Sequence, residues 1–128
     1  MEKKQSRVRE IKFYSKKNGE MSLVHSERAK AYAAFLERSP DVEKYECCVP
    51  LEKSSYIHIE TVGIRKSYFS TDWTTDFRVK FADGRIGVFE MAKLSELLKD
   101  SIIQKLEFSR RYWSQQGVSF WKILLVEG

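Results

Sequence analysis

The order of strand and helix patterns in the C-terminal half constrains the fold of this chain most. Residues 75–93, "TDFRVKFADGRIGVFEMAK", hold two extended segments around an Asp-Gly pair, which is a hairpin signal. A helical pattern follows from about Leu94 to Gln116, Gly117 is placed to end it, and "VSFWKILLV" then predicts a buried strand. A strand–helix–strand crossover places its strands parallel. We therefore expect an α/β domain with a mixed sheet, in the order helix, antiparallel strands, helix, parallel strand.

Shorter patterns predict the remaining elements. Ser22 or Ser26 can cap a helix that runs to about Arg38. The segment "YECCVPL" fits an edge strand or a strand end because its proline cannot donate to a ladder, and "YIHIE" alternates with the period of a strand. The linking "TVGIRKSYFST" fits a loop or a short strand. The apolar stripe predicted along the second helix comprises Leu98, Ile102, Leu106 and Trp113.

The hairpin carries an acid near each end, and its register decides whether the two acids meet. A three-residue loop over residues 82–84, with Gly84 in the left-handed conformation, places Asp76 directly opposite Glu90. Two like charges in that arrangement are destabilising unless a positive group separates them, so this register predicts a divalent metal site. A two-residue loop would instead pair Asp76 with Met91 and turn Glu90 to the other face. The sequence leaves both registers open.

The positive charge of the chain lies at its start. Residues 1–17 hold seven basic and two acidic residues, a net of +5 that equals the net charge of the whole chain. We expect residues 1–21 to form a basic arm that neutralises DNA phosphates, attached to a single domain over residues 22–128. A solvated tail that aids solubility is an equal alternative. The arm residues expected to bind DNA are Lys3, Lys4, Arg7, Arg9 and Lys12.

Size and composition limit the class of protein. A chain of 128 residues with 42% hydrophobic content fits one globular domain with its own core. No apolar run approaches the roughly 20 residues that span a bilayer, and the start has no apolar segment typical of a signal peptide, so we expect a cytoplasmic protein without membrane contact. Cys47 and Cys48 are neighbours without the paired spacing of a zinc site, which predicts reduced structural thiols.

Three stretches together resemble the PD-(D/E)XK nuclease superfamily, and within it the N-terminal catalytic domain of TnsA-type transposon-end endonucleases. They are "HSERAKAYAAFLERSPDVEKYE", "YFSTDWTTDFRVKFADGRIGVFEMAK" and "KLEFSRRYWSQQGVSFWKILLVE", and they cover most of residues 22–127. The resemblance lies in the order of Glu27 on a first helix, Asp76 in "TDFRV" and Glu90 in "VFEMAK". It implies a restriction-endonuclease-like core for this domain.

The resemblance implies hydrolysis of DNA phosphodiesters assisted by Mg²⁺, with Mn²⁺ as an alternative. Carboxylates in such sites hold hard cations, which activate water and stabilise charge on the scissile phosphate. By position, Asp76 and Glu90 would be the metal ligands. Glu27 would be a further ligand or would support one from the first helix.

The catalytic lysine of the superfamily has no direct counterpart in this chain. The pattern requires a lysine two residues after the second acid, and Ala92 occupies that position. Lys93 comes one residue late, so it would need a bulge or an early strand end to turn inward. Lys105 on the next helix is the other basic residue that could supply the charge.

The resemblance also implies partners. TnsA-type subunits cut DNA at the ends of a mobile element beside a separate transposase, so we expect DNA, and a transposase or another protein of a transposon or phage, as partners. Because Ala92 replaces the lysine, the alternative is a catalytically silent relative that binds DNA or regulates a mobile element. An unrelated small α/β domain is the third interpretation.

Overall fold

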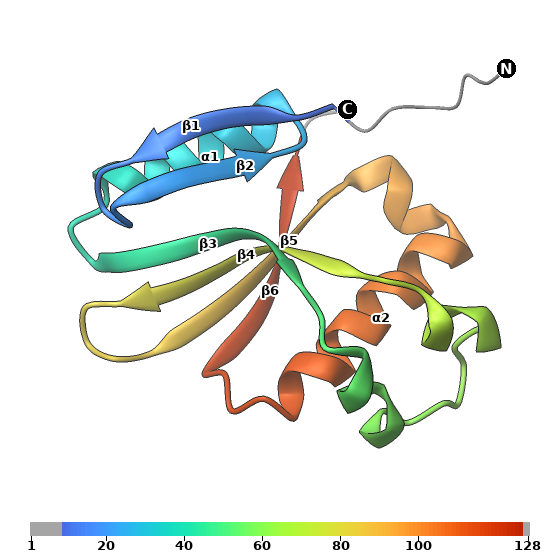
Figure 1. Ribbon diagram of the computed structural model, residues 1–128. Coiled ribbons are helices and arrows are strands. Elements are labelled where there is room, and N and C mark those ends of the chain that lie inside the picture. Colours follow the sequence, from blue (N-terminus) through green and yellow to red (C-terminus); the bar gives the residue numbers. More distant parts are fainter. Residues whose placement is uncertain (1–8, 127–128) are drawn as a thin grey trace, which may run out of the picture.

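The computed structural model describes residues 9–126 and has a mixed α/β architecture (Figure 1). Its main sheet has four strands in the order β3-β4-β5-β6. The first three strands are antiparallel, whereas β6 runs parallel to β5, which confirms the predicted crossover. The strand bounds are Val42–Pro50 for β3, Thr74–Phe81 for β4, Ile86–Lys93 for β5 and Phe120–Val126 for β6.

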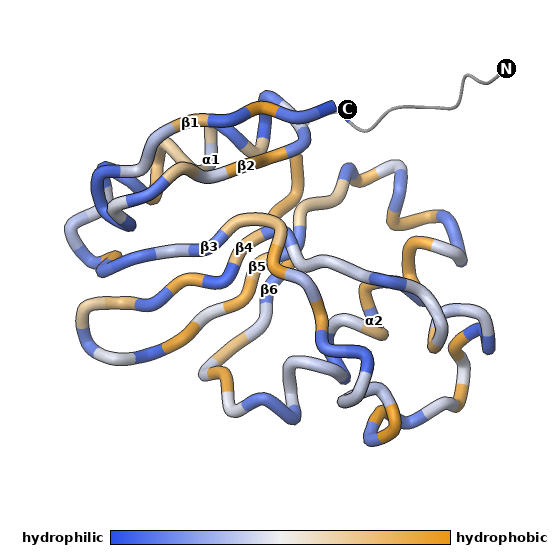
Figure 2. Tube along the Cα trace, viewed as in Figure 1, coloured by the Kyte–Doolittle hydropathy of each residue, from blue (hydrophilic) through white to orange (hydrophobic). Residues whose placement is uncertain are grey.

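A second sheet of two strands begins the described chain, and it corrects the predicted domain boundary. Strands β1 (Ile11–Ser15) and β2 (Glu20–Val24) form an antiparallel hairpin. Along β1, Ile11 and Phe13 pack against the core while Lys12 is exposed, so apolar and charged residues alternate (Figure 2). The predicted arm over residues 1–21 is therefore wrong from β1 onward, because the hairpin belongs to the folded domain. Residues 1–8 lie outside the described residues.

Helix α1 (Glu27–Arg38) follows the hairpin and covers one face of the main sheet (Figure 1). Ser26 caps it, since its Oγ accepts a hydrogen bond of 3.0 Å from the Ala29 amide, as one of the two predicted caps. The buried side of the helix carries Ala29, Ala33 and Leu36. These side chains pack with residues of β3, β4 and β5 in one of two hydrophobic clusters.

Helix α2 (Asp100–Ser114) covers the opposite face of the sheet (Figure 1). The predicted single helix from Leu94 is wrong in its first part, because a 3-10 turn, η3 (Leu94–Leu98), precedes α2 and the backbone at Lys99 is extended. The break turns Leu98 outward, where it is 86% exposed. No helix within the described residues is long and apolar enough to cross a membrane.

Two short 3-10 turns, η1 (Lys53–His58) and η2 (Lys66–Ser70), connect β3 to β4. The predicted strand at "YIHIE" is therefore wrong. Tyr56 and Ile59 are both buried, and their spacing of three residues matches the period of a 3-10 turn as closely as alternation matches a strand. Their burial under α2 decides between the two patterns.

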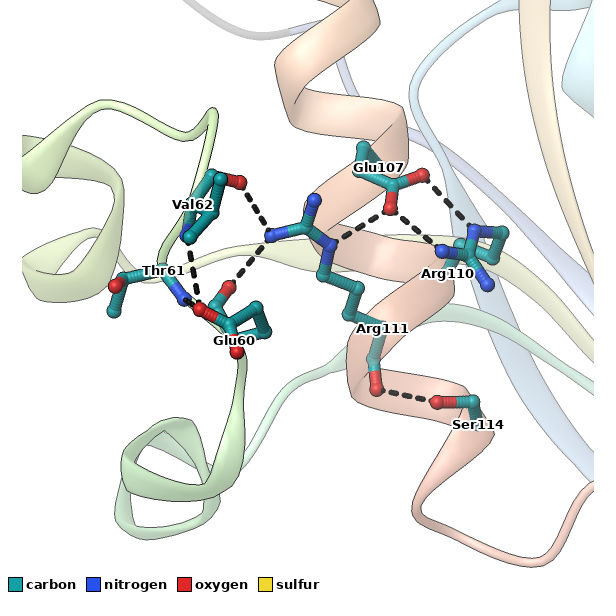
Figure 3. A network of polar contacts seen from close by, with 7 residues as sticks. All are labelled: Glu60, Thr61, Val62, Glu107, Arg110, Arg111 and Ser114. Carbon is teal, nitrogen blue, oxygen red and sulfur yellow. Dashed lines mark hydrogen bonds and ion pairs between the residues drawn. The ribbon is translucent and has the colours of Figure 1, made fainter.

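An arginine on α2 fastens this connection to the helix (Figure 3). Nη1 of Arg111 donates to the carbonyl oxygens of Glu60 at 2.6 Å and Val62 at 2.8 Å. Its Nε donates to Glu107 Oε2 at 2.7 Å, and Arg110 donates to the same carboxylate. The hydrogen bonds from Arg110 and Arg111 lower the pKa of Glu107 to about 2, so the carboxylate stays charged. The connecting segment is thus held against α2 by hydrogen bonds to its backbone.

Candidate functional site

The β4–β5 hairpin has the register that brings the two acids together. Gly84 has a φ of 92°, in the left-handed region, and the Phe81 amide donates to the Arg85 carbonyl at 2.9 Å across the three-residue loop. Phe77 pairs with Phe89 farther along. One more step along both strands sets Asp76 opposite Glu90, so the three-residue loop is the correct alternative.

The ladder between β4 and β5 opens at these two acids. Regular pairing ends at Phe77 and Phe89. Beyond it, the Asp76 amide donates to Glu90 Oε1 at 3.1 Å, and the Met91 amide donates to Asp76 Oδ2 at 2.7 Å. Each carboxylate thus accepts a backbone hydrogen bond at a place where a ladder would supply a carbonyl oxygen. The two strands are held together here by side chains.

The neighbouring strand is irregular at the same level. The pairs between β3 and β4 include Cys47 with Phe77 and Val49 with Thr75 but omit Cys48, whose φ is 50°. A positive φ is unusual for a residue with a side chain. Cys47 and Cys48 are both free thiols, as the sequence predicts. The main sheet is therefore interrupted on both sides of Asp76.

The Glu90 carboxylate is buried within a hydrogen-bonded network. Glu90 is 5% exposed, and its Oε2 accepts from Thr75 Oγ1 at 2.8 Å and from Ser109 Oγ at 2.5 Å. These hydroxyls accept in turn from two indoles, Trp113 Nε1 to Thr75 at 2.7 Å and Trp121 Nε1 to Ser109 at 3.0 Å. Strand β4, helix α2 and strand β6 thus all contribute to holding this carboxylate in one orientation.

Burial and mutual repulsion keep a proton on the carboxylate pair at mildly acidic pH. Burial, followed by the charge of Asp76, raises the pKa of Glu90 to about 7, against the lowering effect of its hydrogen bonds. Burial also raises the pKa of Asp76, opposed by the Met91 amide and the charge of Lys105. Two carboxyl groups in contact lose their protons in coupled steps. The second proton therefore leaves near neutral pH.

Lys105 on α2 is the predicted lysine that lies near the pair. Its positive charge lowers the pKa of Asp76, and its Nζ lies 5.6 Å from the centre of the Trp73 ring. Trp73 and Lys105 line a small hollow together with Glu90 and Ser109. The ring supports the lysine stem and ammonium by a cation–π contact beside the acids.

Lys93 points away from the pair. Strand β5 keeps its regular parallel register with β6 through Ala92 and Lys93, so it contains no bulge that would turn Lys93 inward. Side chains alternate along a strand, which places Ala92 on the face of Glu90 and Lys93 on the opposite face. Ala92 is 3% exposed. The register of β5 therefore does not support Lys93 as a site residue.

Glu27 is also separate from the pair. Its carboxylate is 65% exposed and forms an ion pair of 2.8 Å with Arg9. The expected role of Glu27 in the site is not supported, because its side chain leaves the helix on the solvent side. The charge of His25, two residues earlier, does lower the pKa of Asp76. Sequence reasoning missed His25, and no motif or spacing signals it.

The basic residues expected to bind DNA fall into two groups. Lys3, Lys4 and Arg7 lie outside the described residues. Arg9 is engaged with Glu27, and Lys12 is exposed on β1. Lys12 forms no ion pair with any residue from 9 to 126 and could meet a phosphate, whereas Arg9 would first have to leave its carboxylate partner.

The oxygen atoms of the two carboxylates suit a hard divalent cation that takes few ligands from the protein. Among residues 9–126, one backbone amide donates to Asp76 Oδ2 and one to Glu90 Oε1, and a side-chain hydrogen bond also joins the two carboxyl groups. Two carboxylates with remaining water ligands suit Mg²⁺, which is reluctant to lose its water shell. Residues 9–126 contain no group of three or more His, Cys, Asp or Glu side chains that could hold a metal ion. A cation here would therefore depend on these two acids and on water or substrate oxygens.

Comparisons with known proteins found no match, so the class of this protein is described from its fold and site geometry. No protein-family model matches the chain, and no curated protein matches its sequence. The fold and the site define a mixed α/β domain with a buried carboxylate pair at an opening in its sheet and a lysine beside it.

Proposed function

We propose that this protein is a metal-dependent DNA endonuclease with a restriction-endonuclease-like core, similar to the TnsA type and associated with a transposon or phage. The observation that carries the proposal is the pairing of Asp76 and Glu90 where the β4–β5 ladder opens, with Lys105 close to Asp76. The order of helix, antiparallel strands, helix and parallel strand supports the same core. A transposase or another mobile-element protein is the proposed partner.

Asp76, Glu90 and Lys105 have different roles in the proposed reaction. Asp76 is held by the Met91 amide and Glu90 is oriented by Thr75 and Ser109, so once the proton between them leaves, both carboxylates could hold Mg²⁺ or Mn²⁺. A cation held by Asp76 and Glu90 would supply an activated water and would neutralise charge on the scissile phosphate. Lys105 places a positive charge near Asp76, where it stabilises the additional negative charge that develops on the phosphate.

Protonation of Glu90 sets the pH range of this activity. Because the pKa of Glu90 is raised to about 7, its proton competes with the cation for the same oxygens. Metal affinity, and with it cleavage, should rise as the pH passes from about 6 to 8. A cation held by the pair would offset the charge of Asp76, which raises this pKa in addition to burial.

A catalytically silent DNA-binding or regulatory protein is the second candidate. Ala92 is buried at the position where the superfamily carries its lysine, and Glu90 accepts three hydrogen bonds, from Thr75, the Asp76 amide and Ser109, that also serve folding. A domain that retains the fold but has lost catalysis would have these features.

Cleavage with a matched charge control tests the proposal. Mg²⁺ and Mn²⁺ are titrated into the protein with supercoiled plasmid, linear duplex and branched DNA, beside Asp76→Asn and Asp83→Asn. Asp83 is an exposed acid in the turn of the same hairpin, so it controls for loss of charge. Metal-dependent cleavage that is lost only in Asp76→Asn supports the endonuclease. DNA binding without cleavage by the unaltered protein supports the silent alternative.

A further inference from the structure

The connection between β3 and β4 forms a second hollow, apart from the carboxylate pair. All of its lining residues lie between Lys53 and Phe69, and its volume is about 760 Å³. Sites for small organic ligands commonly have volumes of roughly 300–1,000 Å³. Neither Asp76 nor Glu90 lines this hollow. The connection pocket, as we name it, is therefore large enough for a small ligand of its own.

The floor of the connection pocket is apolar. Tyr56, Ile59 and Ile64 line it and are 4%, 4% and 9% exposed. The Tyr56 hydroxyl donates to the Thr71 carbonyl at 3.0 Å, so its polar atom already has a partner within the fold. Ile57 also lines the pocket and is 83% exposed. An apolar ligand would remove this surface from water, which favours binding.

Two lysines give the pocket a positive charge. Lys53 and Lys66 line it, whereas no Asp or Glu does. Lys66 forms no ion pair with any residue from 9 to 126. Lys53 pairs with Asp72 at 3.2 Å, but that carboxylate is 89% exposed. Because exposed ion pairs contribute little to stability, Lys53 can also contact an anion. The pocket thus combines an apolar floor with positive charge.

Hydrogen bonds to α2 hold one wall of the pocket in place (Figure 3). Nη1 of Arg111 donates to the carbonyl oxygens of Glu60 and Val62. Oε2 of Glu60 accepts from the amides of Thr61 and Val62 at 3.2 and 3.3 Å. Thr61, which lines the pocket, therefore lies between two residues that are held in place. A wall that is ordered in advance lowers the entropic cost of binding.

We propose that the connection pocket binds a small organic anion, a ligand with an apolar body and one acidic group. The apolar body lies on the side chains of Tyr56, Ile59 and Ile64, and the acidic group faces Lys53 and Lys66. Aliphatic and aromatic carboxylic acids belong to this class. The binding activity goes beyond the proposed DNA cleavage and does not depend on it.

The lining argues against two other classes of ligand. A DNA backbone gains its affinity from many basic contacts to phosphates, whereas here two lysines flank an apolar floor. A neutral apolar ligand would gain nothing from the charge of either lysine. Polarity and charge together therefore select a ligand that is both apolar and anionic.

The hollow between β1 and α1 lacks this combination. Its volume is about 280 Å³, and Lys30 and Arg38 line it together with Glu37. The Glu37 carboxylate accepts hydrogen bonds from the hydroxyls of Ser15 and Tyr45. An acidic side chain beside the basic ones opposes the binding of an anion. Lys30 therefore offers a control for a lysine that lines a different hollow.

Titration with a fluorescent anion and its neutral analogue tests the proposal. The anion is anilinonaphthalene sulfonate, and the analogue is phenylnaphthylamine, which has the same rings without the sulfonate. The unaltered protein should bind the sulfonate saturably and more tightly than the amine. Lys66→Gln should weaken sulfonate binding about threefold to fivefold and leave amine binding unchanged, because the lysine charge acts only on the anion. Ile57→Ser should weaken the binding of both.

Lys30→Gln is the matched control and should leave both affinities unchanged. Lys66 and Ile57 are exposed, so their variants should retain the fold, which circular dichroism confirms. The proposal is overturned by the absence of saturable binding or by equal affinity for sulfonate and amine. A loss in Lys30→Gln as large as in Lys66→Gln overturns it as well.

Competition for the bound sulfonate tests the class of ligand. Decanoate should displace it at about tenfold lower concentration than decanol, because two lysines face the carboxylate and decanol has the same chain without the charge. A short DNA duplex should not displace it. Equal displacement by decanol, or displacement by the duplex, overturns the proposal. None of these measurements uses DNA cleavage, so failure of the proposed function would not be mistaken for failure of ligand binding.

Discussion

Ser109 on α2 donates a hydrogen bond of 2.5 Å to Glu90 on β5 and thereby joins the helix to the carboxylate pair. The same hydroxyl accepts from Trp121 on β6. One small side chain thus links the crossover helix to both parallel strands, at the acid proposed to hold the metal. The orientation of Glu90 therefore depends on the packing of α2 against β5 and β6.

Removing that hydroxyl should change the titration of the site more than its shape. Ser109→Ala takes away a donor that favours the charged form of Glu90, so the pKa of Glu90 should rise above about 7. The variant should also lose about 1–3 kcal/mol of unfolding free energy, because it leaves an indole without its acceptor. We expect Mg²⁺ binding at pH 7 to weaken and to recover at higher pH.

The measurement is Mg²⁺ affinity by calorimetry across pH, with Ser114→Ala as the control. Ser114 lies on the same helix, and its Oγ donates to the Arg111 carbonyl at an exposed position. Its loss should leave both the affinity and its pH profile unchanged. An unaltered pH profile in Ser109→Ala would show that this hydrogen bond does not tune Glu90.

The stability of the metal-free protein should fall as the pH rises through the range set by Glu90. The pKa of this group is raised from 4.5 to about 7 on folding, so between these values the folded state binds more protons than the unfolded state. Unfolding free energy therefore decreases with pH in that window, by an amount on the order of 3 kcal/mol for a group this deeply buried. Above the window the decrease is complete.

Urea denaturation between pH 4.5 and 8 measures this dependence. Glu90→Gln cannot ionise, so its profile should be flatter over the same range, and saturating Mg²⁺ at pH 8 should restore part of the lost stability in the unaltered protein. Exposed Glu60→Gln serves as the control for a carboxylate outside the site. A parallel slope for Glu90→Gln and the unaltered protein would contradict the assignment of the titration to Glu90.

Substitution of Lys105 and of Lys93 tests which lysine serves the site. The structure favours Lys105, whereas the sequence position favours Lys93. Lys105→Met should lower the rate of metal-dependent cleavage by about 10²–10³, the usual effect of removing one group that stabilises developing charge. The side chain is exposed, so the fold should survive. Lys93→Met should cleave at close to the unaltered rate, because Lys93 points to the opposite face of β5.

Single-turnover cleavage with saturating Mn²⁺ compares the two variants. Circular dichroism confirms that each variant is folded before its rate is interpreted. A larger loss in Lys93→Met than in Lys105→Met would reverse the assignment and would require β5 to bulge when DNA binds.

The sequence alone determined the features that depend on neighbouring residues. The Asp-Gly pair predicted the β4–β5 hairpin and limited it to two registers, and the structure has the three-residue loop that sets Asp76 opposite Glu90. The cap at Ser26 and the buried side of α1 follow from residues within one or two turns. The parallel direction of β6 follows from the handedness and length of a crossover connection. Each of these is decided by geometry within a short stretch of chain.

Tertiary packing decided the rest, because the deciding contacts lie far apart in the chain. The period of "YIHIE" fits a strand or a 3-10 turn, and only burial of Tyr56 under α2 selects the turn. The basic residues around β1 led to the prediction of an arm, whereas Ile11 and Phe13 of β1 pack against the core. Likewise, the direction of Glu27 and the approach of Lys105 depend on how two helices lie against one sheet. A residue's place in the sequence sets which face of its own element it occupies, but the charge or partner it meets there is set by the packing of elements against each other.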